Sequence, residues 1–291
     1  MDENRTEKLM EIVGLVDSSS ISTIKEVIGE ILGTIRDVST SAKDLKDLIE
    51  KDPPLCAKLL KRANSAYYGY PRTISDIQEA IVCLGFDAVK ELALNQKACD
   101  LFAEEEVFEG FSRWSLWKHS VAVAECSKML YRKVFKEHGE DSYAVGLLHD
   151  LGIIVENQFF DYQFKQALKK SSEEKTNLHC AEKEILLVNH AEIGQAIMVN
   201  WNFPDEMSSA IGFHHEPNLL KNKEVEKNVL ILFLANRICQ REDIGYSDAP
   251  YEDKALFQDC LSKLDITKEI LDLIVEELAK HIKKMEEMKW L

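Results

Sequence analysis

The chain has 291 residues, with 36 Lys and Arg against 51 Asp and Glu, so its formal net charge is -15. Such an acidic surface repels phosphate backbones, which argues against sequence-independent binding to nucleic acid. The longest apolar runs fall far short of the roughly 20 residues that cross a bilayer, so we expect no membrane span. The charged start is unlike a secretory signal, and the 7 cysteines include no Cys-x-x-Cys pair. We therefore expect a cytoplasmic protein whose cysteines behave as small apolar residues.

Apolar residues recur at steps of three and four through almost the whole chain, which predicts an all-α fold without strands. In the first half, the two prolines at 53–54 are typical of a first helical turn. The sequence Ser75-x-x-Gln78 matches a capping box, and Gly85 ends the helix that we expect to follow it. A further helix should continue to about Leu101.

The second half is also expected to be helical. The predicted helices cover residues 115–135, 142–150, 157–170, 180–200, 205–216 and 225–241. After a loop around 245–250, two amphipathic helices at about 253–261 and 265–288 reach the end of the chain. Their apolar stripe needs a covering surface, which either the rest of this chain or a second copy could supply.

The placement of histidines is the most informative feature of the sequence. Six residues share an inward-facing position or a helix end: His119, His149, Asp150, His190, His214 and His215. Burying several imidazoles costs free energy unless they are paired, and a shared divalent metal is one such partner. We therefore predict a common metal site, with Gly194 allowing a second helix to approach the helix of His190. Three other histidines occupy charged or loop contexts and are expected to lie outside it: His138, His179 and His281.

The segment Gly146–Gly152 (GLLHDLG), preceded by His119, resembles the signature of the HD superfamily of metal-dependent phosphohydrolases. With His190 and the pair at 214–215, the set is similar to the fuller ligand set of the HD-GYP branch. The resemblance implies that these side chains, together with Asn236, are the metal ligands. It also makes Asp150 the candidate catalytic residue if the site is active.

The first half narrows the resemblance to one branch of that superfamily. The segments LLKRANSAYY (59–68) and ISDIQEAIVCLGFDAVKELAL (74–94) resemble the HDOD family, HD-related output domains of bacterial signalling proteins. This resemblance implies an HD-like helical lobe packed on an N-terminal helical lobe, followed by C-terminal amphipathic helices. The expected boundaries are 1–19 for an N-terminal helix, 20–240 for the HDOD domain with lobes 20–110 and 111–240, and 241–291 for a C-terminal helical extension.

Two positions depart from a working HD hydrolase. Asn236 stands where the superfamily uses a final aspartate, and an amide oxygen brings no charge to a divalent cation. Ile153 stands where HD-GYP-like enzymes commonly carry a lysine that can meet a substrate phosphate. The GYP loop is also missing after His215. These differences argue against efficient hydrolysis, which depends on a metal that activates water.

Three interpretations follow from the sequence. The first is a non-catalytic signalling module that acts on a protein partner and keeps a degenerate HD pocket. The second is an iron-binding sensor of redox state or oxygen, because imidazole and carboxylate ligands suit iron. The third is a metal-dependent phosphohydrolase acting on a nucleotide or cyclic dinucleotide. Among metals, the ligand set favours Fe, followed by Mn, Zn or Ni.

Overall fold

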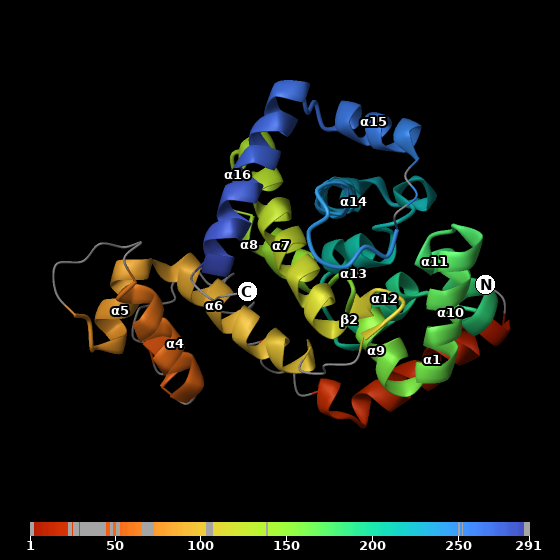
Figure 1. Ribbon diagram of the computed structural model, residues 1–291, viewed down its shortest axis with the longest axis horizontal. Coiled ribbons are helices and arrows are strands. Elements are labelled where there is room, and N and C mark those ends of the chain that lie inside the picture. Colours follow the sequence, from red (N-terminus) through yellow and green to blue (C-terminus); the bar gives the residue numbers. More distant parts are fainter. Residues whose placement is uncertain are drawn as a thin grey trace. The chain divides into compact units, whose positions relative to one another are not determined.

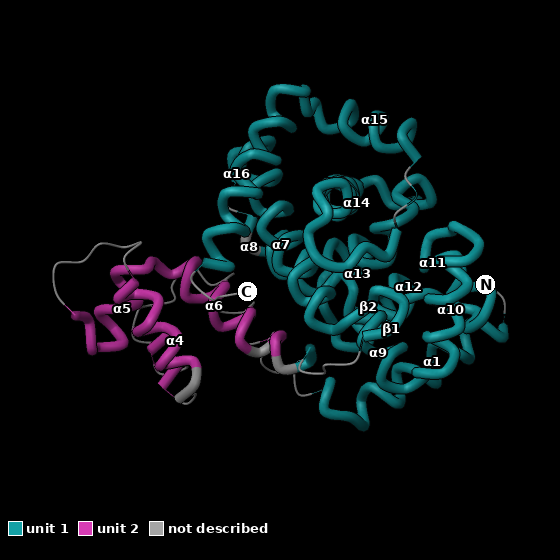
Figure 2. Tube along the Cα trace, viewed as in Figure 1, with its two compact units in different colours: residues 1–22, 101–291 teal, residues 23–100 magenta. Residues whose placement is uncertain are grey.

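The computed structural model divides the chain into two compact units (Figure 2), Met1–Ser22 with Leu101–Leu291 as unit 1 and Thr23–Asp100 as unit 2. Helices make up nearly all of the regular structure of both units (Figure 1), which confirms the all-α class. The structure describes residues 3–22, 25, 29, 45–46, 49–50, 53–65, 73–102, 107–137, 139–249, 251 and 253–287.

Unit 2 contains three described helices, α4 (Pro53–Ala63), α5 (Ile77–Leu84) and α6 (Phe86–Cys99). The connection between α4 and α5 is fixed by Asn64, whose side chain accepts from the Ile74 backbone N–H and donates to the Ile74 carbonyl, both at 2.7 Å. These two hydrogen bonds tie the end of α4 to the residues that precede α5, and the two helices pack against each other.

The start of α5 differs from the predicted capping box. Asp76 rather than Ser75 is the N-cap, and its carboxylate accepts from the Glu79 backbone N–H at 2.8 Å. A carboxylate at this position also complements the positive end of the helix dipole. The predicted stop is confirmed, because Gly85 ends the helix with φ +84°.

Unit 1 is built around α7 (Arg113–Phe135), a long helix that packs against α8, α14 and α16. The other elements are α1 (Glu3–Asp17), η1 (Ser20–Ser22), η2 (Asp100–Phe102, which begins at the last residue of unit 2), β1 (Val107–Phe108), β2 (Phe111–Ser112), α8 (Glu140–Leu148), α9 (Leu151–Phe159), α10 (Asp161–Glu174), α11 (Leu178–Leu186), α12 (His190–Asn200), α13 (Asp205–Gly212), η3 (Pro217–Leu219), η4 (Lys223–Val225), α14 (Glu226–Arg241), α15 (Lys254–Lys263) and α16 (Lys268–Glu287).

Two glycines set the spacing of the central helices. A Cβ on Gly146 would lie 2.7 Å from the Ala124 Cα, so α8 touches the backbone of α7 directly. A Cβ on Gly194 would lie 2.8 Å from the Ile211 Cγ2, which confirms the expected close approach of a helix, here α13, to α12. Both contacts draw together helices whose ends carry the predicted metal ligands.

The described elements correct the sequence prediction in four places. The segment 151–174, for which the sequence predicts a helix only over 157–170, forms two helices, α9 and α10, that meet at Phe160. The chain does contain one strand pair, because β1 and β2 form a short antiparallel hairpin. The helix expected over 180–200 is two helices, since Leu187 has φ +70° and Asn189 starts α12 with a capping box. The helix expected over 205–216 ends at Gly212, so the two histidines that follow lie beyond its last turn.

The C-terminal helix α16 covers α7 with the apolar stripe that the sequence indicates. Its buried residues are Ile274, Leu278, Ile282 and Met285. This stripe therefore finds its covering surface within the chain. No helix in the described ranges combines the length and the apolar character needed to cross a membrane.

Candidate metal centre

The predicted site residues come from five separate parts of unit 1 and meet in its interior. His119 lies in the second turn of α7, and Asn236 lies on α14. The adjacent His149 and Asp150 form the junction between α8 and α9, with His149 as the C-cap of one helix and Asp150 as the N-cap of the next. His190 is the first residue of α12.

The pair that follows α13 completes the set of seven. His214 and His215 are only 1% and 5% exposed, and the other five members are 1% exposed or less. The residues that the sequence singles out are therefore all brought together and all withdrawn from solvent. Their assignment as metal ligands stays a prediction.

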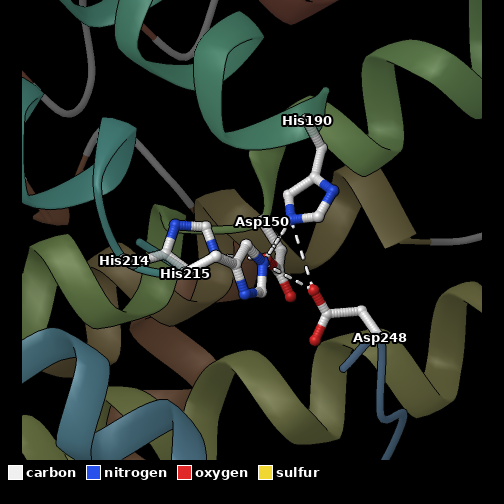
Figure 3. A group of neighbouring side chains, drawn as sticks. All are labelled: Asp150, His190, His214, His215 and Asp248. Atoms are coloured by element: carbon white, nitrogen blue, oxygen red, sulfur yellow. Dashed lines mark hydrogen bonds and ion pairs between the residues drawn. The ribbon is translucent and has the colours of Figure 1, made fainter. Parts of the chain in front are cut away.

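The donor atoms form two overlapping groups, each with all its atoms within 4.8 Å of one another. The larger group is drawn in Figure 3 and comprises Asp150, His190, His214, His215 and Asp248. The smaller group comprises His119, His149 and Asp150. Because Asp150 belongs to both, its two carboxylate oxygens can serve neighbouring positions.

Three of the imidazoles direct Nδ1 at a backbone carbonyl. A carbonyl oxygen can only accept, so the Nδ1 atom facing it carries a proton, and in a neutral imidazole the Nε2 atom then keeps its lone pair. The Nδ1···O distances are 3.2 Å from His119 to Ile244, 2.7 Å from His149 to Gly146 and 2.6 Å from His214 to Ile211. The Nε2 atoms of His149 and His214 therefore face the cluster, whereas Nε2 of His119 is paired with Asn236 Oδ1 at 3.0 Å.

His190 is oriented by a buried carboxylate. Its Nδ1 lies 2.7 Å from Glu182 Oε2, and its backbone N–H donates to the same oxygen at 3.0 Å. Glu156 is a buried neighbour of Glu182. Burial and the charge of the Glu182 carboxylate raise the pKa of Glu156 well above its usual value. Glu156 is thus kept protonated, so one negative charge rather than two supports His190. Such carboxylate–imidazole pairs are typical of metal-ligating histidines.

The lone pairs and the carboxylates face one another without hydrogen bonds. His149 Nε2 lies 3.1 Å from Asp150 Oδ2, and His214 Nε2 lies 3.5 Å from Asp150 Oδ1. All four of these atoms are buried without a hydrogen-bond partner in the structure. A lone pair opposite a carboxylate oxygen is repulsive unless a proton or a metal ion lies between them, and converging imidazole and carboxylate donors of this kind fit a divalent metal.

The electrostatics agree with a site that attracts cations. Burial lowers the pKa of His149, but the charge of Asp150 and the contact with its carboxylate outweigh burial and leave the pKa above its usual value. Burial raises the pKa of Asp150, yet the charge of His149 and the close contacts with His149 and His214 hold it well below its usual range. For His214, burial dominates and lowers the pKa, so this imidazole is neutral and ready to act as a ligand.

Asp248 is the site residue that the sequence prediction missed. It lies in the segment after α14, is 1% exposed, and places its Oδ2 atom 2.8 Å from His215 Nε2 and 3.3 Å from His190 Nε2. The predicted position on α14 holds Asn236, whose Oδ1 atom lies 3.0 Å from His119 Nε2. The available signal was an acidic residue in a loop expected to follow α14, but periodicity does not place loop residues.

Of the three histidines expected to lie outside the site, His179 differs from the expected charged or loop setting. It is buried in α11 and stacks on the ring of His215 with centroids 4.3 Å apart, so it contacts the cluster although it belongs to neither donor group. Burial lowers the pKa of His179 to about 4, which keeps it neutral. His281 on α16 lies 3.2 Å from the Glu125 carboxylate on α7. His138 lies outside the described residues.

An all-α unit with a buried cluster of histidines and aspartates at helix ends defines an HD-type protein. The family comparison agrees, because the HDOD domain matches residues 21–217, more than half of the chain. The chain therefore belongs to the HDOD family.

Solved structures share this fold over nearly the whole chain. An HDOD domain protein of unknown function from Geobacter sulfurreducens is 26% identical, with a TM-score of 0.81, covering 97% of this chain and 96% of that one. A protein provisionally named a phosphohydrolase, from Shewanella amazonensis, is 22% identical with a TM-score of 0.69, covering 97% of each chain. A provisionally named signal transduction protein from Marinobacter aquaeolei is 20% identical with a TM-score of 0.77, covering 99% of this chain and 66% of that one.

A curated relative is longer than this chain. An uncharacterized protein from Treponema pallidum is 28% identical over 187 residues, which is 64% of this chain and 36% of the relative. The chain thus matches about a third of that protein's length.

Proposed function

We propose that this HDOD protein is a non-catalytic signalling module that holds a divalent transition metal in its buried histidine–aspartate cluster and acts through a protein partner. The observation that carries the proposal is the burial of the donor set, in which each side chain is at most 5% exposed. A metal-dependent hydrolase must admit both its substrate and the attacking water to the ion. Donors withdrawn this far from solvent suit an ion that stabilises a conformation.

The residues around the HD pair support the same conclusion. Ile153 occupies the position at which a lysine could meet a phosphate, and its side chain is fully buried in α9. Asn236 places an uncharged amide against His119, a member of the smaller donor group. A phosphoester would therefore meet neither a cationic side chain at position 153 nor a carboxylate at position 236.

Iron-dependent sensing of redox state or oxygen is the second candidate. Several neutral imidazoles with two carboxylates form a nitrogen and oxygen donor set that suits iron. A redox sensor requires no substrate to reach the ion, so the burial of the donors is compatible with it. Loss or gain of an electron at the ion would change the charge balance of the cluster and could reach a partner through the helices that bear the ligands.

The experiment that tests the proposal is elemental analysis of the protein purified without a metal-affinity column, beside His149→Ala and His281→Ala. Near-stoichiometric metal is expected in the wild type and in His281→Ala, since His281 pairs with Glu125 away from the donor groups. His149→Ala should lose the metal. Absence of metal from the wild type, even after addition of Fe²⁺, Mn²⁺ and Zn²⁺, would contradict the proposal.

Catalysis is tested separately on the metal-loaded protein. We expect no turnover of phosphomonoesters, nucleotides or cyclic dinucleotides. Turnover that disappears in Asp150→Ala would instead establish a hydrolase and refute the non-catalytic part of the proposal.

A further inference from the structure

The segment that follows α14 folds back over the cluster. We call the described residues 242–249 and 251 the closing loop. The Ile244 carbonyl faces His119 Nδ1 at 3.2 Å, and the Tyr246 backbone N–H donates to the Ser115 carbonyl at 2.9 Å. Gly245 lies between these contacts with φ +77°, and a Cβ there would lie 2.5 Å from the backbone nitrogen of His119. The loop is thus pressed against the backbone of α7 at the turn that carries a predicted ligand.

The far end of the closing loop is anchored on α11 and α14. The Asp248 carbonyl accepts from the Leu178 backbone N–H at 2.8 Å, and the Ala249 carbonyl accepts from Arg237. Tyr251 donates its backbone N–H to the Asn177 side chain at 2.9 Å and accepts from it at 3.0 Å. Backbone contacts at both ends hold the loop in one conformation.

A hydrogen-bonded chain of two side chains orients the carboxylate of Asp248. Arg237 Nη1 donates to Gln240 Oε1 at 2.9 Å, and Gln240 Nε2 donates to Asp248 Oδ1 at 2.5 Å. One carboxylate oxygen is therefore held on the α14 side. The other, Oδ2, points at His190 and His215 and is buried without a hydrogen-bond partner in the structure (Figure 3). This is the arrangement of an oriented ligand.

Charge balance points to the same role. In the donor set the sequence predicts, Asp150 is the only carboxylate, because position 236 is an asparagine. One carboxylate would leave a buried divalent cation with an uncompensated positive charge, which is costly in a medium of low polarity. Asp248 brings the total to two carboxylates, which equals the charge of the ion while the imidazoles stay neutral.

We propose that Asp248 is a metal ligand and that the closing loop seals the ion in a site made entirely of protein donors. The inference rests on the proposed metal centre and deepens it. Asp248 supplies the charge that Asn236 lacks, from a loop rather than from a helix. Gln240 acts as a positioning residue for this ligand.

The test compares Asp248→Asn with Asp243→Asn, which removes the same charge from an exposed position of the same loop. Asparagine tolerates the positive φ of position 243, so the control introduces no backbone strain. The full chain is titrated with Co²⁺ against a chelator to obtain affinities, and visible absorption reports the ligand set. Binding of Mn²⁺, followed by water-proton relaxation, reports whether water reaches the ion.

We expect Asp248→Asn to lower Co²⁺ affinity by more than about 100-fold and to change the visible spectrum of bound Co²⁺. It should also raise the water-proton relaxation rate caused by bound Mn²⁺, because water can then reach the ion. Asp243→Asn should match the wild type in all three measurements. Gln240→Met, which removes the positioning hydrogen bond at nearly constant volume, should lower affinity by about 10-fold and raise relaxation in the same direction. Gln240→Met therefore provides the test if Asp248→Asn fails to fold.

Two outcomes would overturn the inference, and they are distinguishable. If the wild type binds Co²⁺ while Asp248→Asn and Gln240→Met retain its affinity and its low relaxation, Asp248 is only a counter-ion for the histidines and the proposed metal centre stands. If the wild type binds none of the metals tested, the metal centre and this inference both fail.

Discussion

Gly152 offers the sharpest test of how the fold positions the site. This residue lies in the first turn of α9, two positions after Asp150. A Cβ at Gly152 would lie 2.0 Å from the carbonyl oxygen of His190, 2.6 Å from its carbonyl carbon and 2.7 Å from its Cα. All three contacts are backbone atoms, so no rotamer change can relieve them. The substitution Gly152→Ala must therefore move α9 and α12 apart.

The size of the effect follows from these distances. A Cβ contact shorter than 3.0 Å essentially never occurs, so the helices must separate by at least about 1 Å. Replacing glycine by alanine within a helix gains about 1 kcal/mol, whereas overpacking costs about 1–3 kcal/mol and occasionally more. With backbone atoms on the opposing side, we expect a net loss of about 2–4 kcal/mol in the free energy of unfolding. The shift also displaces His190, so metal affinity should fall as well.

The assay is urea unfolding of chelator-treated protein, which removes any contribution of a bound metal to stability. Gly14→Ala is the matched control, because Gly14 lies at an exposed position of α1 where an added Cβ would meet nothing within 4 Å. It should stabilise the protein by up to about 1 kcal/mol. A value for Gly152→Ala within about 0.5 kcal/mol of the wild type would refute the argument that backbone contact sets the spacing of α9 and α12.

Three further predictions concern the supports of the cluster. Glu182→Gln should lower metal affinity about 10- to 100-fold, measured by chelator competition, because Glu182 orients His190. The control Glu184→Gln, on the exposed side of α11, should leave metal affinity unchanged. Equal affinities of the two variants would contradict the role of Glu182. Asn189→Ala removes the N-cap of α12 and should cost about 1 kcal/mol in thermal unfolding, and an unchanged melting temperature would show that the cap is dispensable. Chelation of the metal should lower the melting temperature of the wild type but not that of His149→Ala; an equal response would place the stabilising ion elsewhere.

Helical periodicity was sufficient to find the histidines because each lies on a helix face, at a helix end or just beyond one. His119 on α7 and Asn236 on α14 meet with Nε2 and Oδ1 3.0 Å apart. His149 and Asp150 are adjacent in sequence and share a junction, so a motif could identify them together. For these residues the sequence spacing and the three-dimensional position are nearly the same information.

The residues that were missed depend on contacts that no spacing encodes. Asp248 reaches the cluster because Gly245 permits a sharp return of the chain at positive φ. Glu156 and Glu182 face the interior as single acidic residues within apolar stretches, and their value lies in their pairing with each other and with His190. The break between α11 and α12 occurs at Leu187 in a left-handed conformation that leucine rarely adopts, so sequence rules favour one continuous helix.

The positions of Asn236 and Asp248 bear on catalysis as well as on metal binding. A set with a carboxylate at position 236 and none at 248 would carry the same total charge as the set proposed here. The difference is that Asp248 lies on the closing loop, whose backbone is hydrogen-bonded to Ser115 and Leu178. If Asp248 binds the ion, its carboxylate occupies a coordination position that a substrate or an attacking water would need. Metal occupancy would then be read out through the position of the closing loop relative to the helices that carry the other ligands.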